Sequence, residues 1–269
     1  MAASVASARI VTAAKSATRT PRAPLHAYVL HSYAWSESSL ILDLFTREQG
    51  RLAVAAKGAK RPYSQLRAVL LPFQRIHASL GRVPSAEGTG EVQTLRGAEW
   101  AGGAAMLTGA ALFSGFYVNE LLMKLLARHD PHPALFDAYA QTLPALAAHD
   151  GLSQAALRAF EVTLLREIGV LPDLSIETLT QQPVDEVPRY TLLAEAGVSA
   201  ARAGEGGVPG ALLIGLQAAL EHGSLPALQH ACAQGAVELK GVLRGMIQHH
   251  LGGAVLRTRQ VMAGVRDIG

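Results

Sequence analysis

The apolar residues of this chain change their spacing once, near Trp100, and this change constrains the fold more than any other feature. Up to Glu99 they form short runs bounded by glycine, proline and polar turns. After Trp100 they recur at intervals of three and four residues, which is the period of a helix with one apolar face. We therefore predict an α+β protein in two parts, in which a β-barrel precedes an all-α helical domain.

Residues 25–100 are expected to form the barrel. Five short strands are predicted, with the first three adjacent in the sequence, at residues 27–31, 39–45, 51–57, 70–80 and 91–99. This pattern favours an OB-fold, a five-stranded barrel whose surface commonly binds oligonucleotides. Residues 1–24 are rich in Ala, Ser, Thr and basic residues, which predicts a disordered basic tail. The alternatives are a nucleic-acid-binding arm, an organellar transit peptide and a wrongly chosen start codon.

Residues 105–258 are expected to form the helical domain. The predicted helices share the spacing of buried helix faces, and they lie at residues 105–128, 135–143, 153–168, 212–222 and 225–250. Pro144 is expected to interrupt the second helix and Gly169 to end the third. Gly235 is one of three glycines that argue against a single final helix.

Two segments of the second part lack a helical pattern. Residues 172–210 are rich in Gly, Pro and acidic residues, so we expect a loop-rich insertion with room for one short hairpin. Residues 259–269 are expected to be a tail.

Composition and missing motifs exclude several classes of function. Cys232 is the only cysteine, which excludes an internal disulfide framework and a cysteine-based zinc site. The chain has no apolar run of about 18 residues, the length that a membrane span requires. It also has no P-loop, no G-x-S-x-G motif and no complete G-x-G-x-x-G motif. We therefore expect no membrane contact, no cofactor, no metal and no enzymatic activity.

The densest group of possible metal ligands is His129, Asp130 and His132. A metal-dependent nuclease could use such a group, and this class of function stays open as an alternative. The adjacent Pro131 and Pro133 instead indicate a turn between two helices, and no other cluster completes a metal shell.

Basic residues concentrate in the first part of the chain. Residues 1–83 contain twelve lysines and arginines but only three carboxylates, whereas the net charge of the whole chain is +3. Such asymmetry indicates an anionic partner for the first part, and nucleic acid is the common intracellular polyanion.

The sequence KGAKRPYSQLR, residues 57–67, is the strongest candidate site. Its cations neutralise phosphates and its tyrosine can stack on an unpaired base. Arg51 and Arg75 come from the flanking strands. The predicted DNA-binding residues of this region are Arg51, Lys57, Lys60, Arg61, Tyr63, Arg67 and Arg75. The alternative is a solvated hairpin loop.

Tyr33 and Trp35 lie in the loop between the first two predicted strands. In an OB-fold this loop borders the binding groove, so both rings are candidates for stacking on bases. The alternative is that Trp35 closes the end of the barrel.

Several longer runs resemble the RecO family of bacterial recombination mediators. The matching runs follow the family's order and lie at residues 27–32, 35–46, 50–52, 56–59, 71–73, 90–95, 117–122, 157–161, 251–253 and 256–259. The resemblance is continuous from about His26 to Ile168, becomes thin, and returns near the C-terminus.

The resemblance implies an OB-fold followed by a helical domain. It further implies binding of single- and double-stranded DNA, annealing of complementary strands and no catalytic turnover. The implied protein partners are RecR and the acidic C-terminal tail of single-stranded DNA-binding protein, with RecA loaded indirectly. A mediator of this kind would be cytoplasmic and associated with the nucleoid.

Two details of the resemblance concern particular residues. Some family members hold a zinc ion on four cysteines in the insertion, but residues 172–210 contain no cysteine, so no zinc is expected here. Arg158 matches a basic position of the family's tail-binding site. An arginine beside Leu157 and Phe160 would suit a tail of acidic residues that ends in an apolar residue and a carboxylate. The alternative is a solvated helix charge.

A second class of function remains open. The barrel could bind a protein instead of DNA, and the chain would then be a non-catalytic adaptor. Charge reversal at Lys60 and Arg61 separates the two classes, because only DNA binding depends on those cations.

Overall fold

The computed structural model describes residues 23–81, 92–103, 106–148, 152–202, 204 and 206–266. The tail predicted at residues 1–24 lies outside the described residues except for its last two, as does nearly all of the stretch between the last two strands of the barrel.

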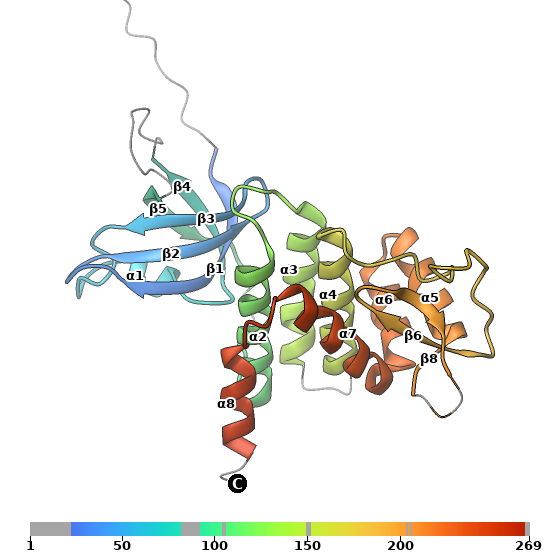
Figure 1. Cartoon of the computed structure of the whole chain (residues 1–269). Helices are drawn as coiled ribbons and strands as arrows, with labels where there is room; N and C mark the ends of the chain where they lie inside the picture. The colour runs from blue at the N-terminus through green and yellow to red at the C-terminus, as the bar shows by residue number, and fades with distance from the viewer. Residues whose placement is uncertain are drawn as a thin grey trace, which may run out of the picture.

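The first part is a closed five-stranded barrel (Figure 1). Its strands are β1 (Leu25–Ala34), β2 (Leu40–Thr46), β3 (Gly50–Ala56), β4 (Arg75–Leu80) and β5 (Val92–Trp100). They follow the order β1-β2-β3-β5-β4, and β4 pairs back with β1. β3 and β5 are parallel and the other pairs are antiparallel. The predicted OB-like barrel is confirmed, although the fourth strand starts only at Arg75 and is preceded by the short helix α1 (Leu66–Val69).

β1 is buried on both faces over most of its length. Ala27 and Val29 point into the barrel, where they pack against Leu42, Leu44 and other aliphatic side chains. Tyr28 and the neighbouring Leu30 belong to the core of the helical domain. A strand covered on both sides has no polar face, which explains why this segment reads as a continuous apolar run.

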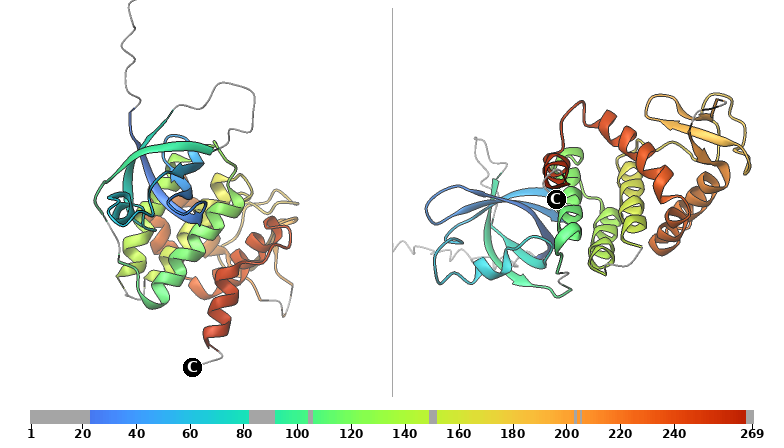
Figure 2. Two further views of the ribbon diagram at one scale, coloured as in Figure 1. Left: turned by 90° about the vertical axis from the view of Figure 1, so that its left-hand side faces the viewer. Right: turned by 90° about the horizontal axis from the view of Figure 1, so that it is seen from below.

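The helical domain contains seven helices among the described residues (Figure 1). They are α2 (Gly109–Leu125), α3 (Pro133–Ala147), α4 (Ser153–Glu167), α5 (Gly210–Glu221), α6 (Leu225–Ala233), α7 (Ala236–His250) and α8 (Arg257–Arg266). α2 packs against β1 of the barrel, α3 packs against α4, and α4 packs against α6 and α7. The two further views show α8 alongside α2, beside the barrel (Figure 2).

The helix ends agree with the sequence at two glycines and differ from it at two other places. Gly169 has a φ of +74° just past the end of α4, and Gly235 separates α6 from α7, as the sequence predicts. Pro144 does not interrupt α3, which continues to Ala147. The segment expected to be a tail from residue 259 onward instead belongs largely to α8.

The insertion is more ordered than its composition suggests. It contains a three-stranded antiparallel sheet of β6 (Arg189–Leu193), β7 (Gly197–Ala200) and β8 (Val208–Pro209), in the order β7-β6-β8. Tyr190, Leu192 and Val198 are buried in the helical core. The second part is therefore not all helical, because these few apolar residues find a partner surface on α7.

Among the described residues, side chains join the barrel directly to helices α2 and α3 at three points. The register of β1 against β2 shifts between Val29 and His31, which leaves Leu30 without a partner residue on β2. Asn119 Nδ2 of α2 donates to the carbonyl oxygen of Leu30 at 2.9 Å, and Tyr139 Oη of α3 donates to Asn119 Oδ1 at 2.6 Å. The second contact is the guanidinium of Arg51, which donates to the carbonyl of Met123 in the last turn of α2.

The third contact is a bidentate ion pair between Arg47 and Asp137. Arg47 Nε and Nη2 lie 3.0 and 2.9 Å from the two carboxylate oxygens of Asp137 on α3. Planar arginine–carboxylate pairs of this kind fix orientation as well as distance. Together the three contacts hold the barrel in one position on the helices.

Gly50 lies at a close backbone approach between the two parts. Its φ is +68°, and a Cβ atom at this position would overlap the carbonyl oxygen of Asp130 in the α2–α3 loop. The same loop is held by the amide of His129, which donates to the carbonyl of Arg51 at 3.0 Å.

Substitution of Gly50 by alanine should destabilise the protein. The positive φ alone costs about 1–3 kcal/mol for a residue with a side chain, and the overlap with Asp130 adds to this cost. Urea unfolding should show a lower midpoint. Gly241→Ala is the control, because Gly241 lies in α7 with open space around it and alanine there should stabilise by about 0.5–1 kcal/mol. Equal midpoints for the two variants would contradict the close approach.

Candidate nucleic-acid interface

The basic loop, defined as residues 57–67, leaves the end of β3 and returns through α1. Gly58 has a φ of +73°, and the backbone then makes consecutive tight turns in which Arg61 N donates to the Gly58 carbonyl and Ser64 N to the Arg61 carbonyl. Ala59 is buried in the barrel core and anchors the loop. The loop is therefore a set of turns fixed at one buried point, with its charged side chains on the outside.

The basic loop is joined to the β1–β2 loop. Lys60 N donates to the carbonyl of Ser38 at 3.0 Å, and Lys60 Nζ donates to the carbonyl of Ser36 at 2.9 Å. An ammonium group has three N–H donors, so this contact leaves others for a ligand. Lys60 and Trp35 are distant in the sequence. The structure brings Lys60 beside the loop that carries Trp35.

The remaining predicted residues of these loops are exposed. The side chains of Lys57, Arg61 and Arg67 face solvent. Tyr63 is 99% exposed and Trp35 is 59% exposed. Trp35 therefore does not close the end of the barrel, and both rings are available for stacking.

A small hollow of about 350 Å³ lies between the basic loop, α1 and β1. Its lining includes Lys60 and Arg67 together with the aliphatic side chains of Leu40, Leu66 and Leu70. Cations beside an apolar lining are suited to a nucleobase and its phosphates.

Arg51 and Arg75 lie elsewhere. Arg51 is at the opposite end of β3 from Lys57, which is roughly 20 Å along the strand. Its guanidinium contacts the end of α2, and burial lowers its pKa. Arg75 lies over the ring of Phe136 at 5.9 Å. Both were expected at the DNA surface from their place in the sequence, but the structure directs them to the helices, because this outer face of the barrel is covered.

Tyr33 is 47% exposed and lies at the edge of a third region. It lines a groove between the barrel and helices α2 and α8, together with Lys124 and Arg257. The sequence did not link these residues, because they are spread over more than 200 positions and carry no common motif. Only the packing of α8 on α2 brings them together.

Arg158 is buried, with 5% of the residue exposed. Its Nη1 lies 2.7 Å from Oε2 of Glu161, one turn further along α4. The expectation that Arg158 offers its guanidinium to an acidic tail at a surface groove is therefore not met, since the cation already has a buried carboxylate partner.

The Arg158–Glu161 pair belongs to a larger polar network. Tyr117 Oη donates to Glu161 Oε1 at 2.7 Å, and Arg259 Nη2 of α8 donates to Tyr117 Oη at 3.1 Å. Burial, reinforced by the Glu161 carboxylate, raises the pKa of Tyr117, so this hydroxyl stays protonated. The network connects α8 to α4 through α2.

Among the described residues, the candidate nucleophile and the candidate metal ligands do not come together in one site. Cys232 is fully buried in α6, and burial raises the pKa of its thiol to about 12. His132 lies between Asp130 and Glu167 at 3.4 and 3.5 Å. Even so, no group of three or more His, Cys, Asp and Glu residues with the geometry of a metal site occurs in the described part of the chain. No described helix is long and apolar enough to cross a bilayer.

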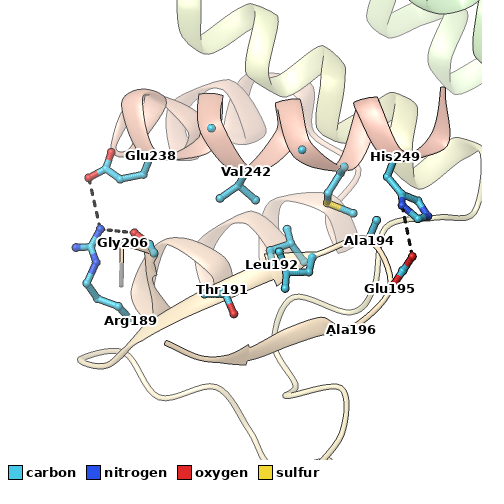
Figure 3. A pocket seen from close by; sticks show the side chains of 15 residues that line it. Arg189, Thr191, Leu192, Ala194, Glu195, Ala196, Gly206, Glu238, Val242 and His249 are labelled. Carbon is cyan, nitrogen blue, oxygen red and sulfur yellow. Dashed lines mark hydrogen bonds and ion pairs between the residues drawn. The ribbon is translucent and has the colours of Figure 1, made fainter. Parts of the chain in front are cut away.

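Another hollow, of about 780 Å³, lies between β6 and α7 (Figure 3). Its lining includes Leu192 and Val242. At its two ends Arg189 approaches Glu238 at 4.0 Å and His249 approaches Glu195 at 3.8 Å, as Figure 3 shows. The guanidinium of Arg189 is matched by Glu238, and Glu195 adds a further carboxylate, so this hollow is not suited to a polyanion.

Comparison with known proteins identifies the same family in both parts of the chain. Residues 24–103 match the family "Recombination protein O N terminal", and residues 106–260 match "Recombination protein O C terminal". The "DNA repair protein RecO" of Polaromonas sp. (strain JS666 / ATCC BAA-500) is 51% identical over 245 residues, covering 90% of this chain and 96% of the relative. The protein of the same description from Delftia acidovorans (strain DSM 14801 / SPH-1) is 50% identical over 247 residues with the same coverage.

Removal of the Arg158 cation should destabilise the fold. In Arg158→Met the carboxylate of Glu161 would remain buried without its ion-pair partner, which costs about 3–5 kcal/mol. The double variant Arg158→Met/Glu161→Gln should recover most of this loss, since it buries no charge. Chemical denaturation measures both effects, with the exposed Arg244→Met on α7 as control. A stable single variant would contradict the buried pair.

The thiol of Cys232 should be unreactive in the folded protein. Burial excludes reagent and keeps the thiol protonated at pH 8. A thiol-specific chromogenic reagent should therefore detect almost no cysteine in native protein and one per chain in denaturant. Rapid native labelling would show that α6 opens easily.

Proposed function

This chain belongs to the RecO family and has a role in DNA repair, and we propose that it acts as a recombination mediator that binds DNA through the basic loop. The mediator binds single- and double-stranded DNA and anneals complementary strands. It makes and breaks no covalent bond.

One observation carries this proposal. Four cations, Lys57, Lys60, Arg61 and Arg67, are exposed on the basic loop, and residues 57–67 contain no carboxylate. The exposed ring of Tyr63 lies among them, and that of Trp35 lies on the adjoining loop. Cations that release counterions from phosphates, combined with rings that stack on bases, are what binding of single strands requires.

Annealing follows from the same electrostatics. Two complementary strands repel each other through their phosphates, and a surface that neutralises part of this charge lowers the repulsion. Stacking of unpaired bases on Tyr63 and Trp35 would hold one strand open for pairing. The loop therefore supplies the attraction, and base pairing supplies the specificity.

The proposed partners follow from family membership. They are RecR and the acidic C-terminal tail of single-stranded DNA-binding protein, and the outcome is loading of RecA on coated strands in the cytoplasm, at the nucleoid. We assign no residue to the tail contact, since Arg158 is occupied by Glu161.

The competing function is that of a non-catalytic adaptor whose barrel binds a protein instead of DNA. It shares the fold and the family but leaves the basic loop solvated. It predicts that DNA affinity does not depend on the loop.

The variant Lys60→Glu/Arg61→Glu tests the proposal. Each phosphate contact on a single strand contributes about 0.7 to the slope of log affinity against log salt, so the four exposed cations of the basic loop contribute about −3 to the slope of the wild type. The variant should bind at least about tenfold more weakly, with a slope reduced by about 1.4. Fluorescence anisotropy with labelled oligo-dT at several salt concentrations measures both quantities.

Lys240→Glu/Arg244→Glu on α7 is the matched control, because it makes the same change in net charge at exposed positions. Unchanged affinity in the loop variant, or an equal loss in the control, would favour the adaptor.

A further inference from the structure

We propose that the groove between the barrel and helices α2 and α8 is a second contact site for single-stranded DNA. The inference rests on the proposed function. It assigns to the strand a path from the basic loop past Trp35 and Tyr33 to Lys124 and Arg257.

The groove has a volume of about 700 Å³ and is built from three separate parts of the chain. Its lining comes from β1, β2 and β3 of the barrel, from α2 and the loop after it, and from α8. The ribbon views agree that α8 lies alongside α2 next to the barrel (Figures 1 and 2).

The charge of the groove is positive. Four cations line it, Arg51, Lys124, Arg128 and Arg257, against the two carboxylates Asp43 and Glu120. The guanidinium of Arg51 is engaged with the end of α2, so the cations that face a ligand are Lys124 and Arg257. Lys124 and Arg257 are exposed to solvent.

Both carboxylates are engaged within the protein. Asp43 lies 3.5 Å from Arg128. Glu120 accepts hydrogen bonds from the amides of Arg257 and Thr258 at 2.9 and 3.0 Å and from the Thr258 hydroxyl at 2.8 Å, so it caps the N-terminus of α8. An approaching phosphate therefore meets the ammonium and guanidinium groups of Lys124 and Arg257, with the negative charges already satisfied.

Aromatic rings accompany these cations. Tyr33 and Phe116 are 47% and 37% exposed and both line the groove. The ring of His31 contacts Tyr33 edge-on, with 4.5 Å between the centroids. A duplex hides the faces of its bases, whereas an unpaired strand can stack them on such rings. This combination of groups selects a single strand as the occupant.

The groove and the basic loop are linked through the end of β1 and the β1–β2 loop. Tyr33 lies two residues before Trp35, about 7 Å along an extended chain. The next residue, Ser36, accepts the hydrogen bond from Lys60. One strand could therefore contact both sites without leaving the surface.

The test compares oligo-dT of about 6 and about 20 nucleotides, since one OB-fold covers about 4–16 nucleotides. Lys124→Glu/Arg257→Glu should weaken binding of the long oligonucleotide at least about tenfold and reduce its salt slope by about 1.4. Affinity for the short one should change less than about twofold, because the basic loop suffices for it. Lys60→Glu/Arg61→Glu should weaken both.

Lys240→Glu/Arg244→Glu is again the control for net charge. If it weakens the long oligonucleotide as much as the groove variant does, the groove proposal is wrong. If wild-type protein binds no DNA, the proposed function itself fails. If wild-type protein binds DNA and the groove variant binds both lengths normally, only the groove proposal fails.

A fluorescent label covers the case in which charge reversal perturbs the fold. Cys232 is buried, so Lys124→Cys can be labelled selectively in native protein, with Arg244→Cys as the matched control. Emission at position 124 should respond to the long oligonucleotide, and emission at position 244 should not. A response only to a peptide rich in Asp and Glu would overturn the proposal in favour of a protein partner.

Discussion

The hydrogen bond from Asn119 to the carbonyl of Leu30 is the contact on which the arrangement of the two parts depends. The bulge in β1 leaves this carbonyl outside the ladder, and an unpaired buried carbonyl would be costly. Asn119 satisfies it and is itself held by Tyr139. The barrel is thereby fixed on the helices by a chain of buried polar groups, with Tyr28 and Leu30 in the surrounding core.

This joint decides which cations are free to bind a ligand. The outer face of the barrel beside α2 and α3 is buried, so Arg51 caps α2 and Arg75 covers the ring of Phe136. The basic loop leaves the other end of β3 and keeps its charges in solvent. The same joint, with α8 held by Glu120 and Arg259, creates the groove that continues from Tyr33. Structural and ligand-facing cations thus differ by position on the barrel, not by residue type.

Much of the fold could be predicted because local patterns decide it. The five strands and most helices followed from apolar spacing, and Gly169 and Gly235 ended helices as their chemistry requires. The prediction that Pro144 interrupts α3 was wrong, because packing of buried residues such as Tyr139 and Leu143 holds the helix together. The sheet of the insertion was underestimated because its strands are short and its few apolar residues gain burial only against distant helices.

The sequence by itself determined the class of fold, the family and the loop in which basic residues and an aromatic ring meet, because each of these resides in neighbouring residues. The tertiary structure alone decided the fate of individual charges. Arg158 looked like a surface charge on a helix, yet it is buried against Glu161. Lys124 and Arg257 looked unrelated, yet they line one groove. The energy of a charge depends on the groups and the solvent around it, and distant parts of the chain supply those surroundings only after folding.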